Sequence, residues 1–527
     1  MPLISFQFML FGIITIGLYF AVPKKRQWIV ICVANIVFYA FSGIVYLVYL
    51  LFTSLVTFWM ALKLEEIAEI GTKLAATADS VSVKTEVRGS ILTVRKLLCG
   101  VAIVLAMGPW IVLKYTSFFI ANVNMLSTWF HSEWQKDTVS WVLPLGISFY
   151  TFHAVGYLVD VYRSKYKAER NFAKYFTFLA YFPHITEGPF SRFDKLGRSI
   201  LEEHSFSYDR LCQGCSRILW GVFKKTVVAD KLGIAITTIL ADYINYSGAY
   251  ILFAVFGYSI RIYADFSGYM DIVCGFSTIL GIDLAENFEQ PYFARTIDEF
   301  WRRWHITLGK WFKDYVFYPV SMGGVGQKMS KMARKKWGAK MGKLVPGYFA
   351  LIFVWSATGI WHGAHWSYLV WGYLNLLVIL STMQLSDTYE AIKTKLHIKS
   401  DSWIWQMFCI LRTFFLVCLL RFFSVGVGLK AFFSMLQKVF FEFNPEVIKN
   451  PILLFVGMSE AEVCGVLIGV ALMIMVDAFN ESGKWDTVKK KCPMVFRNAI
   501  YAGLILFIMV LAGGSSDLTG GFMYANF

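Results

Sequence analysis

The chain has 527 residues, of which 57% are hydrophobic and 18% aromatic, whereas only 16% are charged. Soluble domains carry about 25% charged residues, so this composition excludes a soluble, disordered or disulfide-scaffold protein. The net charge is +15, and the basic residues gather in short stretches between apolar segments, as in the cytoplasmic loops of membrane proteins. Because no nucleic-acid-binding motif accompanies these stretches, we expect an all-α polytopic membrane protein with no nucleic-acid partner.

The first apolar segment, residues 3–22, is uncharged and long enough to cross a bilayer core of about 30 Å. Lys24, Lys25 and Arg26 follow it directly, whereas no basic residue precedes it. This polarity is the opposite of that of a cleaved signal peptide. The positive-inside rule therefore predicts a retained helix with its N-terminus outside and the basic triplet in the cytoplasm.

Residues 28–62 are uncharged and too long for one crossing, so we expect the chain to fold back near Ser42 and Gly43. Further spans are predicted within residues 97–119, 138–159, 173–185, 232–260, 345–360, 366–383, 403–423, 463–476 and 498–514. The sequence thus predicts roughly 10 to 13 transmembrane or re-entrant helices.

Three connecting regions are polar. Residues 63–96 carry both signs of charge and predict a loop with a surface helix, and residues 163–174 are basic. Residues 327–343 hold seven Lys and Arg and no acid, which predicts a cytoplasmic location. Composition favours a topological signal near anionic lipid for this run, and a docking surface for an anionic donor or carrier is the alternative.

His362 lies between two apolar segments, where an ionisable group costs a few kcal/mol and is a functional hypothesis by default. Its neighbours Gly359, Gly363 and Ala364 are small, which allows close backbone approach and favours a helix break beside a cavity. A neutral imidazole at this depth can take a proton from a hydroxyl group. A helix-packing role for His362 is equally compatible with the composition.

Residues 297–305 alternate acids, bases and large aromatic side chains, which predicts one amphipathic helix with Trp301 and His305 on the same face. Arg302 and Arg303 are suited to binding phosphates through charge-assisted hydrogen bonds. The alternative is an interfacial helix with an aromatic belt and snorkelling arginines. The chain has neither a phosphate-binding loop nor a G-x-S-x-G nucleophile motif, so any acyl donor must be activated elsewhere.

Residues 301–305 (WRRWH) and 361–364 (WHGA), whose histidines are 57 positions apart, resemble the paired signatures of the membrane-bound O-acyltransferases. The likeness is greatest to the bacterial branch of alginate O-acetylation and D-alanyl transfer membrane subunits. Supporting motifs lie at residues 144–149, 157–163, 182–189, 221–230, 265–271 and 287–292.

This resemblance implies one integral-membrane domain over residues 1–527, with core motifs within 140–385 and flanking helices at 1–139 and 386–527. Such proteins form a funnel of helices around a central tunnel. The resemblance implies that His362 and His305 are the catalytic residues, with His305 lining the tunnel beside His362. The other substrate- or tunnel-lining residues it implies are Trp301, Arg302, Arg303, Trp304, Trp361, Gly363, Asp271 and Tyr269.

The resemblance also implies O-acetylation of an extracellular polysaccharide from the bacterial cytoplasmic membrane. The donor would be cytoplasmic acetyl-CoA or an acyl-carrier-protein thioester, and the partner a separate extracytoplasmic acetyltransferase, with no bound cofactor and no metal. A D-alanyl or lipid acyltransferase of the same superfamily is one alternative. A polysaccharide or lipid transporter without chemistry is another, against which the lack of an inverted repeat argues.

Overall fold

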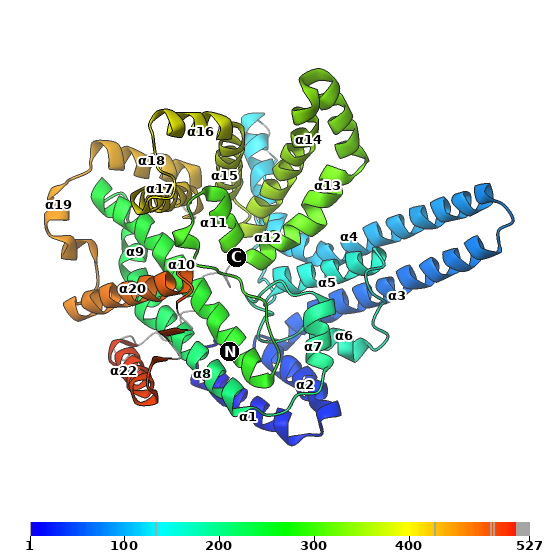
Figure 1. Cartoon of the computed structure of the whole chain (residues 1–527), viewed down its shortest axis with the longest axis horizontal. Helices are drawn as coiled ribbons and strands as arrows, with labels where there is room; N and C mark the ends of the chain where they lie inside the picture. The colour runs from blue at the N-terminus through cyan, green and yellow to red at the C-terminus, as the bar shows by residue number, and fades with distance from the viewer. Residues whose placement is uncertain (1, 132–133, 426–427, 485–486, 489–490, 513–527) are drawn as a thin grey trace. The chain divides into compact units, whose positions relative to one another are not determined.

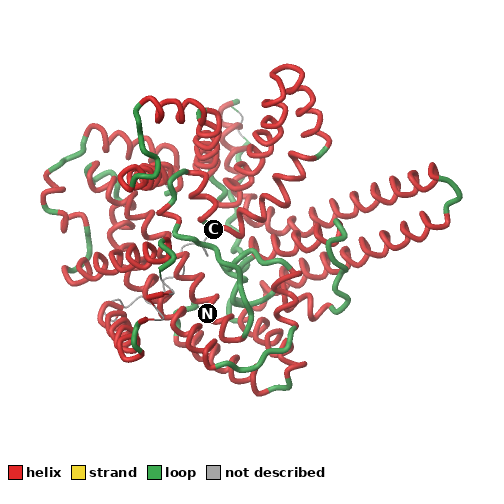
Figure 2. Tube along the Cα trace, in the orientation of Figure 1, coloured by secondary structure: helices red, strands yellow, loops and turns green. Residues whose placement is uncertain are grey.

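The computed structural model describes residues 2–131, 134–425, 428–484, 487–488 and 491–512. Within these ranges the regular secondary structure is helical, without a β-strand (Figure 2). The chain divides into two compact units, Met1–Cys215 with Val273–Ala285, and Ser216–Ile272 with Glu286–Phe527. The expected single domain around a central tunnel stays a prediction.

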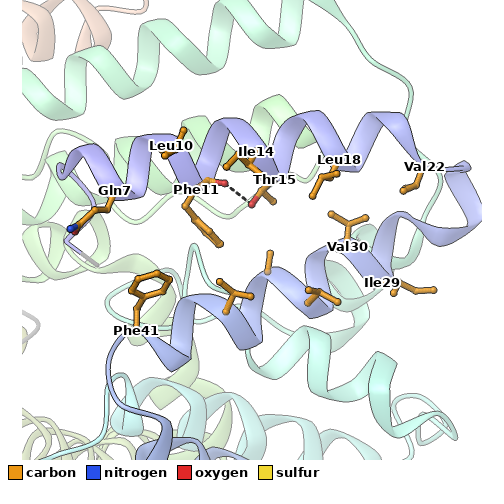
Figure 3. A pocket seen from close by; sticks show the side chains of 13 residues that line it. Gln7, Leu10, Phe11, Ile14, Thr15, Leu18, Val22, Ile29, Val30 and Phe41 are labelled. Carbon is orange, nitrogen blue, oxygen red and sulfur yellow. Dashed lines mark hydrogen bonds between the residues drawn. The ribbon is translucent and has the colours of Figure 1, made fainter.

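The first unit contains the N-terminal helices (Figure 1). They are α1 (Phe6–Ala21), α2 (Gln27–Ala40), α3 (Leu47–Thr77), α4 (Val81–Trp129), α5 (Ile147–Tyr162), α6 (Phe172–Leu179) and α7 (Arg198–Leu201). α1 and α2 run side by side in opposite directions (Figure 3). An aromatic cluster of Phe8, Phe38 and Phe182 packs beneath them, with ring centroids 5.6–6.3 Å apart.

Helices α8 (Tyr208–Phe223) and α10 (Gly248–Leu280) contribute residues to both units. The second unit continues with α9 (Lys231–Ala241), α11 (Ile297–Arg303), α12 (Ile306–Phe312), α13 (Tyr318–Met322), α14 (Gly324–His362), α15 (Trp366–Gln384), α16 (Ser386–Lys395), α17 (Trp403–Arg421), α18 (Gly428–Phe441), α19 (Glu446–Lys449), α20 (Glu460–Glu481) and α22 (Met494–Ala512).

In the described part of the chain, eight helices are long and apolar enough to cross a membrane, and α1 is a shorter apolar helix. This confirms an all-α, multi-pass membrane protein. The eight are fewer than the predicted 10 to 13 because some apolar segments are only partly helical. Within residues 173–185, for example, α6 has 8 residues. The predicted fold-back near Ser42 and Gly43 is confirmed, since α2 ends at Ala40 and α3 begins at Leu47.

The surface helix predicted within residues 63–96 is present, but the loop is much shorter than predicted and covers only residues 78–80. α3 continues to Thr77 and α4 begins at Val81, so the two helices extend beyond their apolar parts as a long antiparallel pair (Figure 1). The Lys, Glu and Ala residues of this stretch are strong helix formers. The side chain of Ser80 caps α4 by accepting the Val83 N–H at 3.3 Å, which supplies the helix-start signal.

Residues 327–343 also lie on a helix, since α14 covers Gly324–His362. Gly338 has a φ of 86° inside it, and the helix is kinked there. Glycine allows this left-handed conformation without a steric penalty. The second limb of α14 therefore leads from the basic run directly to His362.

Candidate functional site

His305 lies at the junction between α11 and α12 and not within one helix. After α11 ends, Trp304 takes an extended conformation and pairs antiparallel with Phe288. The N–H of Ile306 donates to the Asn287 carbonyl at 3.1 Å. His305 itself has a φ of 47°, a sparsely populated backbone region for a residue with a side chain, and such residues cluster at functional sites.

The prediction of one helix over residues 297–305 is therefore wrong at its C-terminal end. Pairing with residues 287–289 replaces the helical hydrogen bonds, because the N–H of Glu289 donates to the Arg303 carbonyl at 3.1 Å. Trp301 lies on α11 and His305 after it. They do not share a helix face.

Asn287 holds the side chains around His305. Its amide oxygen accepts hydrogen bonds from the Thr307 N–H at 3.0 Å and the Thr307 hydroxyl at 2.6 Å, and lies 3.4 Å from His305 Nδ1. The amide nitrogen of Asn287 lies 3.2 Å from the sulfur of Met270. A proton on His305 Nδ1 would give this oxygen a third hydrogen bond and leave the lone pair on Nε2.

The surroundings of His305 keep its ring neutral. The side chain is buried, and the ring of Phe266 meets it edge-on at 4.9 Å between centroids. His305 lies outside the eight long apolar helices, and burial lowers its pKa to about 3. The lowered pKa favours the neutral imidazole, which can donate one hydrogen bond and accept another.

His362 ends α14, and the helix break predicted after it is present. Gly363 has extended backbone and α15 begins at Trp366. A Cβ at Gly363 would lie 2.3 Å from the ring of Tyr368, so any larger residue requires this ring to shift. The His362 ring is buried, 5.1 Å from the ring of Trp371 and 6.3 Å from that of Tyr368.

Trp361 brings the two histidines to one place. Its ring centroid is 6.0 Å from that of His305 and 4.9 Å from that of His362. Their relative exposures are 4% for His305, 8% for His362 and 2% for Trp361. Two imidazoles that are 57 positions apart in the sequence therefore contact the same buried indole. A thioester meeting a hydroxyl group needs such a water-poor environment, because bulk water would hydrolyse it.

Three side chains of α15 that the sequence analysis did not single out complete this environment. Tyr368 and Trp371 contact His362, and Asn375 accepts a hydrogen bond from the Trp301 indole N–H at 3.2 Å. They are spaced i, i+3 and i+7, which places them on one helix face. The sequence signal for this face is Asn375, a single amide side chain within an apolar segment, which indicates a functional or packing position.

The two arginines of α11 are engaged by acids. Arg302 pairs with Asp298 on the same helix. Arg303 binds Glu299 and Glu481, each at 2.6 Å. Their phosphate-binding role stays a prediction. Trp304, another predicted site residue, is buried, and the guanidinium of Arg421 lies 4.8 Å above the Trp304 ring.

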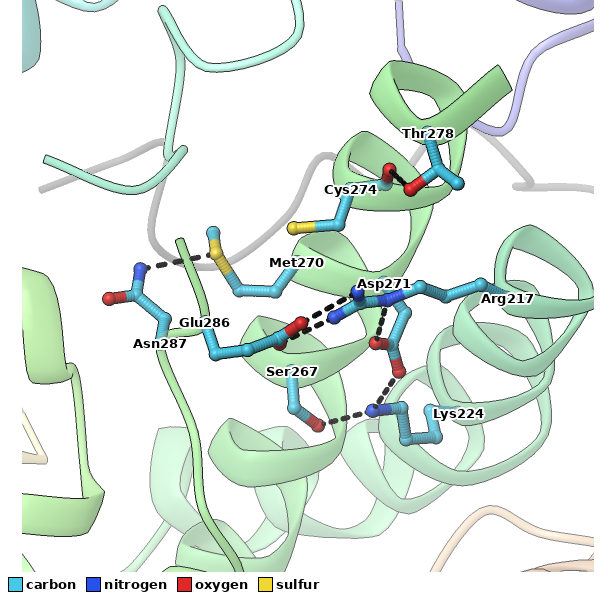
Figure 4. Close-up of polar contacts among 9 residues, drawn as sticks. All are labelled: Arg217, Lys224, Ser267, Met270, Asp271, Cys274, Thr278, Glu286 and Asn287. Carbon is cyan, nitrogen blue, oxygen red and sulfur yellow. Dashed lines mark hydrogen bonds and ion pairs between the residues drawn. The ribbon is translucent and has the colours of Figure 1, made fainter. Parts of the chain in front are cut away.

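Asp271 belongs to an ion-pair network (Figure 4). Its carboxylate binds Lys224 at 2.7 Å and Arg217 at 2.9 Å, and Arg217 also binds Glu286 at 2.6 Å. Tyr269 is buried on the same helix, α10. The contribution of both residues to a substrate site stays a prediction.

The part of the chain that holds both histidines matches a known family. Residues 168–426 match the model of the membrane-bound O-acyltransferase family. The chain belongs to this family. The match covers α10, α11, α12, α14 and α15 and the loop that holds Asn287, which all contribute to the surroundings of the histidines.

Three bacterial relatives show the range of this family. The chain is 32% identical over 363 residues to the probable alginate O-acetylase of Pseudomonas putida, covering 69% of this chain and 66% of that protein. It is 26% identical over 413 residues to the peptidoglycan O-acetyltransferase of Helicobacter pylori, covering 71% and 68%. It is 28% identical over 280 residues to the teichoic acid D-alanyltransferase of Bacillus subtilis, covering 52% and 66%. The alignments span 61–66% of the alginate relatives, less than two thirds of their length.

Proposed function

We propose that this membrane-bound O-acyltransferase moves an acetyl group from a cytoplasmic thioester to the hydroxyl groups of an extracellular polysaccharide. The observation that carries the proposal is the meeting of His305 and His362 at the buried indole of Trp361. Family membership supports acyl transfer. Two of the similar proteins are named for O-acetylation, of alginate and of peptidoglycan.

In the proposed reaction, His362 accepts the proton of the acceptor hydroxyl as its oxygen attacks the thioester carbonyl carbon. The carbon–sulfur bond then breaks, the sulfur takes the proton from His362, and the products are an ester and a free thiol. Burial lowers the pKa of His305, which disfavours this ring as the proton acceptor. We assign His305 to hydrogen bonding in the site, with Asn287 as its positioning residue.

The proposed donor is acetyl-CoA, with an acyl-carrier-protein thioester as the second choice. The seven cations of residues 327–343 are exposed on α14, which ends at His362. A polyanionic donor is attracted by such a surface, and the attraction weakens in salt. We place the protein in the cytoplasmic membrane of a bacterium with its N-terminus outside, and propose a separate extracytoplasmic acetyltransferase as partner.

The experiment that tests this function uses proteoliposomes. Acetyl-CoA labelled in its acetyl group is supplied on the side of the membrane where residues 327–343 lie. Cell-envelope glycan and an extract of extracytoplasmic proteins are supplied on the opposite side. We expect alkali-labile label in the glycan. Label confined to lipid would instead indicate a lipid acyltransferase, and glycan movement without ester formation would indicate a transporter. Transfer of D-alanine in place of acetate would indicate the D-alanyl branch.

Removing charge from the basic run tests the donor surface. For Lys335→Gln with Lys336→Gln we expect a KM for acetyl-CoA about 3- to 10-fold higher with kcat unchanged, because exposed charges add modest, uniform binding. The control is Lys73→Gln with Arg88→Gln, which removes two exposed cations from α3 and α4. Equal KM values in both double variants would show that residues 327–343 act only as a topological signal.

Asn287→Leu tests the positioning of His305. It removes the oxygen 3.4 Å from His305 Nδ1, and we expect kcat to fall about 10²-fold with little change in KM, as for a misplaced reacting group. Thr307→Val is the control, since it removes another hydrogen bond to the same oxygen. A similar loss of kcat in both variants, or a higher KM in Asn287→Leu, would argue for a merely structural Asn287.

A further inference from the structure

An apolar cavity of about 540 Å³ lies between α1 and α2 in the first unit. Figure 3 shows aliphatic and aromatic side chains of the two helices facing each other across it. The residues that line it are Gln7, Leu10, Phe11, Ile14, Thr15, Leu18, Val22, Ile29, Val30, Val33, Ala34, Val37 and Phe41. We call this feature the α1–α2 groove.

The α1–α2 groove presents almost no polar atoms. The hydroxyl of Thr15 donates to the Phe11 carbonyl on its own helix at 2.7 Å, so its proton is already hydrogen-bonded and does not require an acceptor in the groove. Buried Thr15 and Ala34 lie among the lining residues, whereas Ile14 and Val33 are more than half exposed. The groove is therefore closed at its base and open along one side, which suits a chain-like apolar ligand.

One end of the groove carries a cluster of cations. Lys24, Lys25 and Arg26 form the turn that joins α1 to α2, beside Val22, and all three are exposed. Lys24 donates to the Ser205 hydroxyl at 2.6 Å. Among the described residues neither Lys25 nor Arg26 forms an ion pair, so this charge is available to an anion.

The residues near the cationic turn are those expected at the headgroup level of a membrane. The ammonium group of Lys174 lies 5.8 Å above the ring of Trp28, just after the cationic turn. Tryptophan is enriched at the headgroup level of membranes. The nearby acids Glu202 and Glu203 form no ion pair with the turn in the described part of the chain, so the cluster keeps its positive charge.

We propose that the α1–α2 groove binds an anionic glycerophospholipid, with one acyl chain in the groove and the phosphate on the turn of Lys24, Lys25 and Arg26. From Gln7 to Val22 the groove extends about 22 Å along α1. One leaflet of a bilayer core is about 15 Å thick, so the groove accommodates a whole acyl chain. The cations select the headgroup, because each cation near a membrane surface attracts anionic lipid.

The test is native mass spectrometry of the full chain with phosphatidylglycerol or phosphatidylcholine of identical acyl chains. We expect one phosphatidylglycerol to bind about 10- to 100-fold more tightly than phosphatidylcholine. The preference should vanish in Lys24→Ser with Lys25→Ser and Arg26→Ser, and persist in Lys24→Arg with Lys25→Arg and Arg26→Lys. Equal binding of the two lipids by the wild-type protein would mean ordinary boundary lipid and overturn the proposal.

Filling the groove tests the place of the acyl chain. We expect Ala34→Phe, whose side chain enters the groove, to lose the lipid. Gly17→Phe should retain it, because a side chain there meets open space and Gly17 does not line the groove. If Ala34→Phe fails to fold, the wild-type protein is cross-linked instead to phosphatidylglycerol that carries a photoreactive acyl chain. We expect this lipid to label α1 and α2. Label spread evenly over other apolar helices, or cross-linking of α1 to a second protein chain, would overturn the proposal.

Discussion

Replacing His362 by alanine is expected to lower kcat for acetyl transfer by about 10²- to 10⁴-fold, the contribution typical of a general acid–base group. The KM for the donor should change little, since the proposed role is proton transfer and not binding. The variant should stay folded, because the ring contacts of the imidazole to Trp371 and Tyr368 join α14 to α15, the next helix along the chain. Initial rates of ester formation, compared at equal amounts of folded protein, measure this effect.

His397→Asn is the matched control for His362→Ala. His397 is an exposed histidine with a φ of 51°, and asparagine tolerates that backbone region. The control should keep the wild-type kcat. If His362→Ala lost activity only in proportion to lost folded protein, His362 would be a packing residue and the proposed mechanism would fail.

Breaking the ion pair between Lys225 and Asp265 is expected to destabilise the protein strongly. Their charged atoms are 2.7 Å apart, and their side chains are 2% and 1% exposed. Lys225 also binds Asp230 at 2.7 Å, but Asp230 is 40% exposed. Asp265→Leu would leave a buried cation short of a partner, which costs about 3–5 kcal/mol. Unfolding in mixed micelles of SDS and a mild detergent measures the loss.

The double variant Lys225→Met with Asp265→Leu shows whether this loss comes from the unpaired charge. Replacing both partners of a buried pair by apolar residues is often neutral, so we expect the double variant to be more stable than Asp265→Leu. Lys449→Ala, which breaks an exposed pair with Glu446, should not measurably lower the stability. A double variant as unstable as the sum of its single variants would contradict this account.

The helix break at His362 could be predicted from the sequence because its causes are local. Small residues flank the histidine, and Gly363 packs directly against the ring of Tyr368. Likewise, the fold-back before α3 follows from the length of an uncharged segment and a local glycine. Composition and hydropathy patterns report on stretches about one helix long, so they are sufficient to predict local helix breaks and turns.

The junction at His305 could not be predicted in the same way, since its cause is distant in the sequence. Residues 297–305 have the charge pattern of one helix, and only pairing of Trp304 with Phe288 ends it. The contact of His305 and His362 with Trp361 likewise depends on tertiary packing. For residues 63–96 the charges predicted a longer loop than the structure has, because helix propensity and the Ser80 cap extend α3 and α4 through most of this stretch.

The central claim is that His362 couples thiol release to ester formation. The most direct measurement is a single turnover with labelled acetyl-CoA, acceptor glycan and the extract of extracytoplasmic proteins, in which free thiol and alkali-labile ester are counted together. The account predicts equal amounts of both in the wild type, a much slower appearance of both in folded His362→Ala, and wild-type behaviour in His397→Asn. Ester formation by folded His362→Ala at the wild-type rate would contradict it.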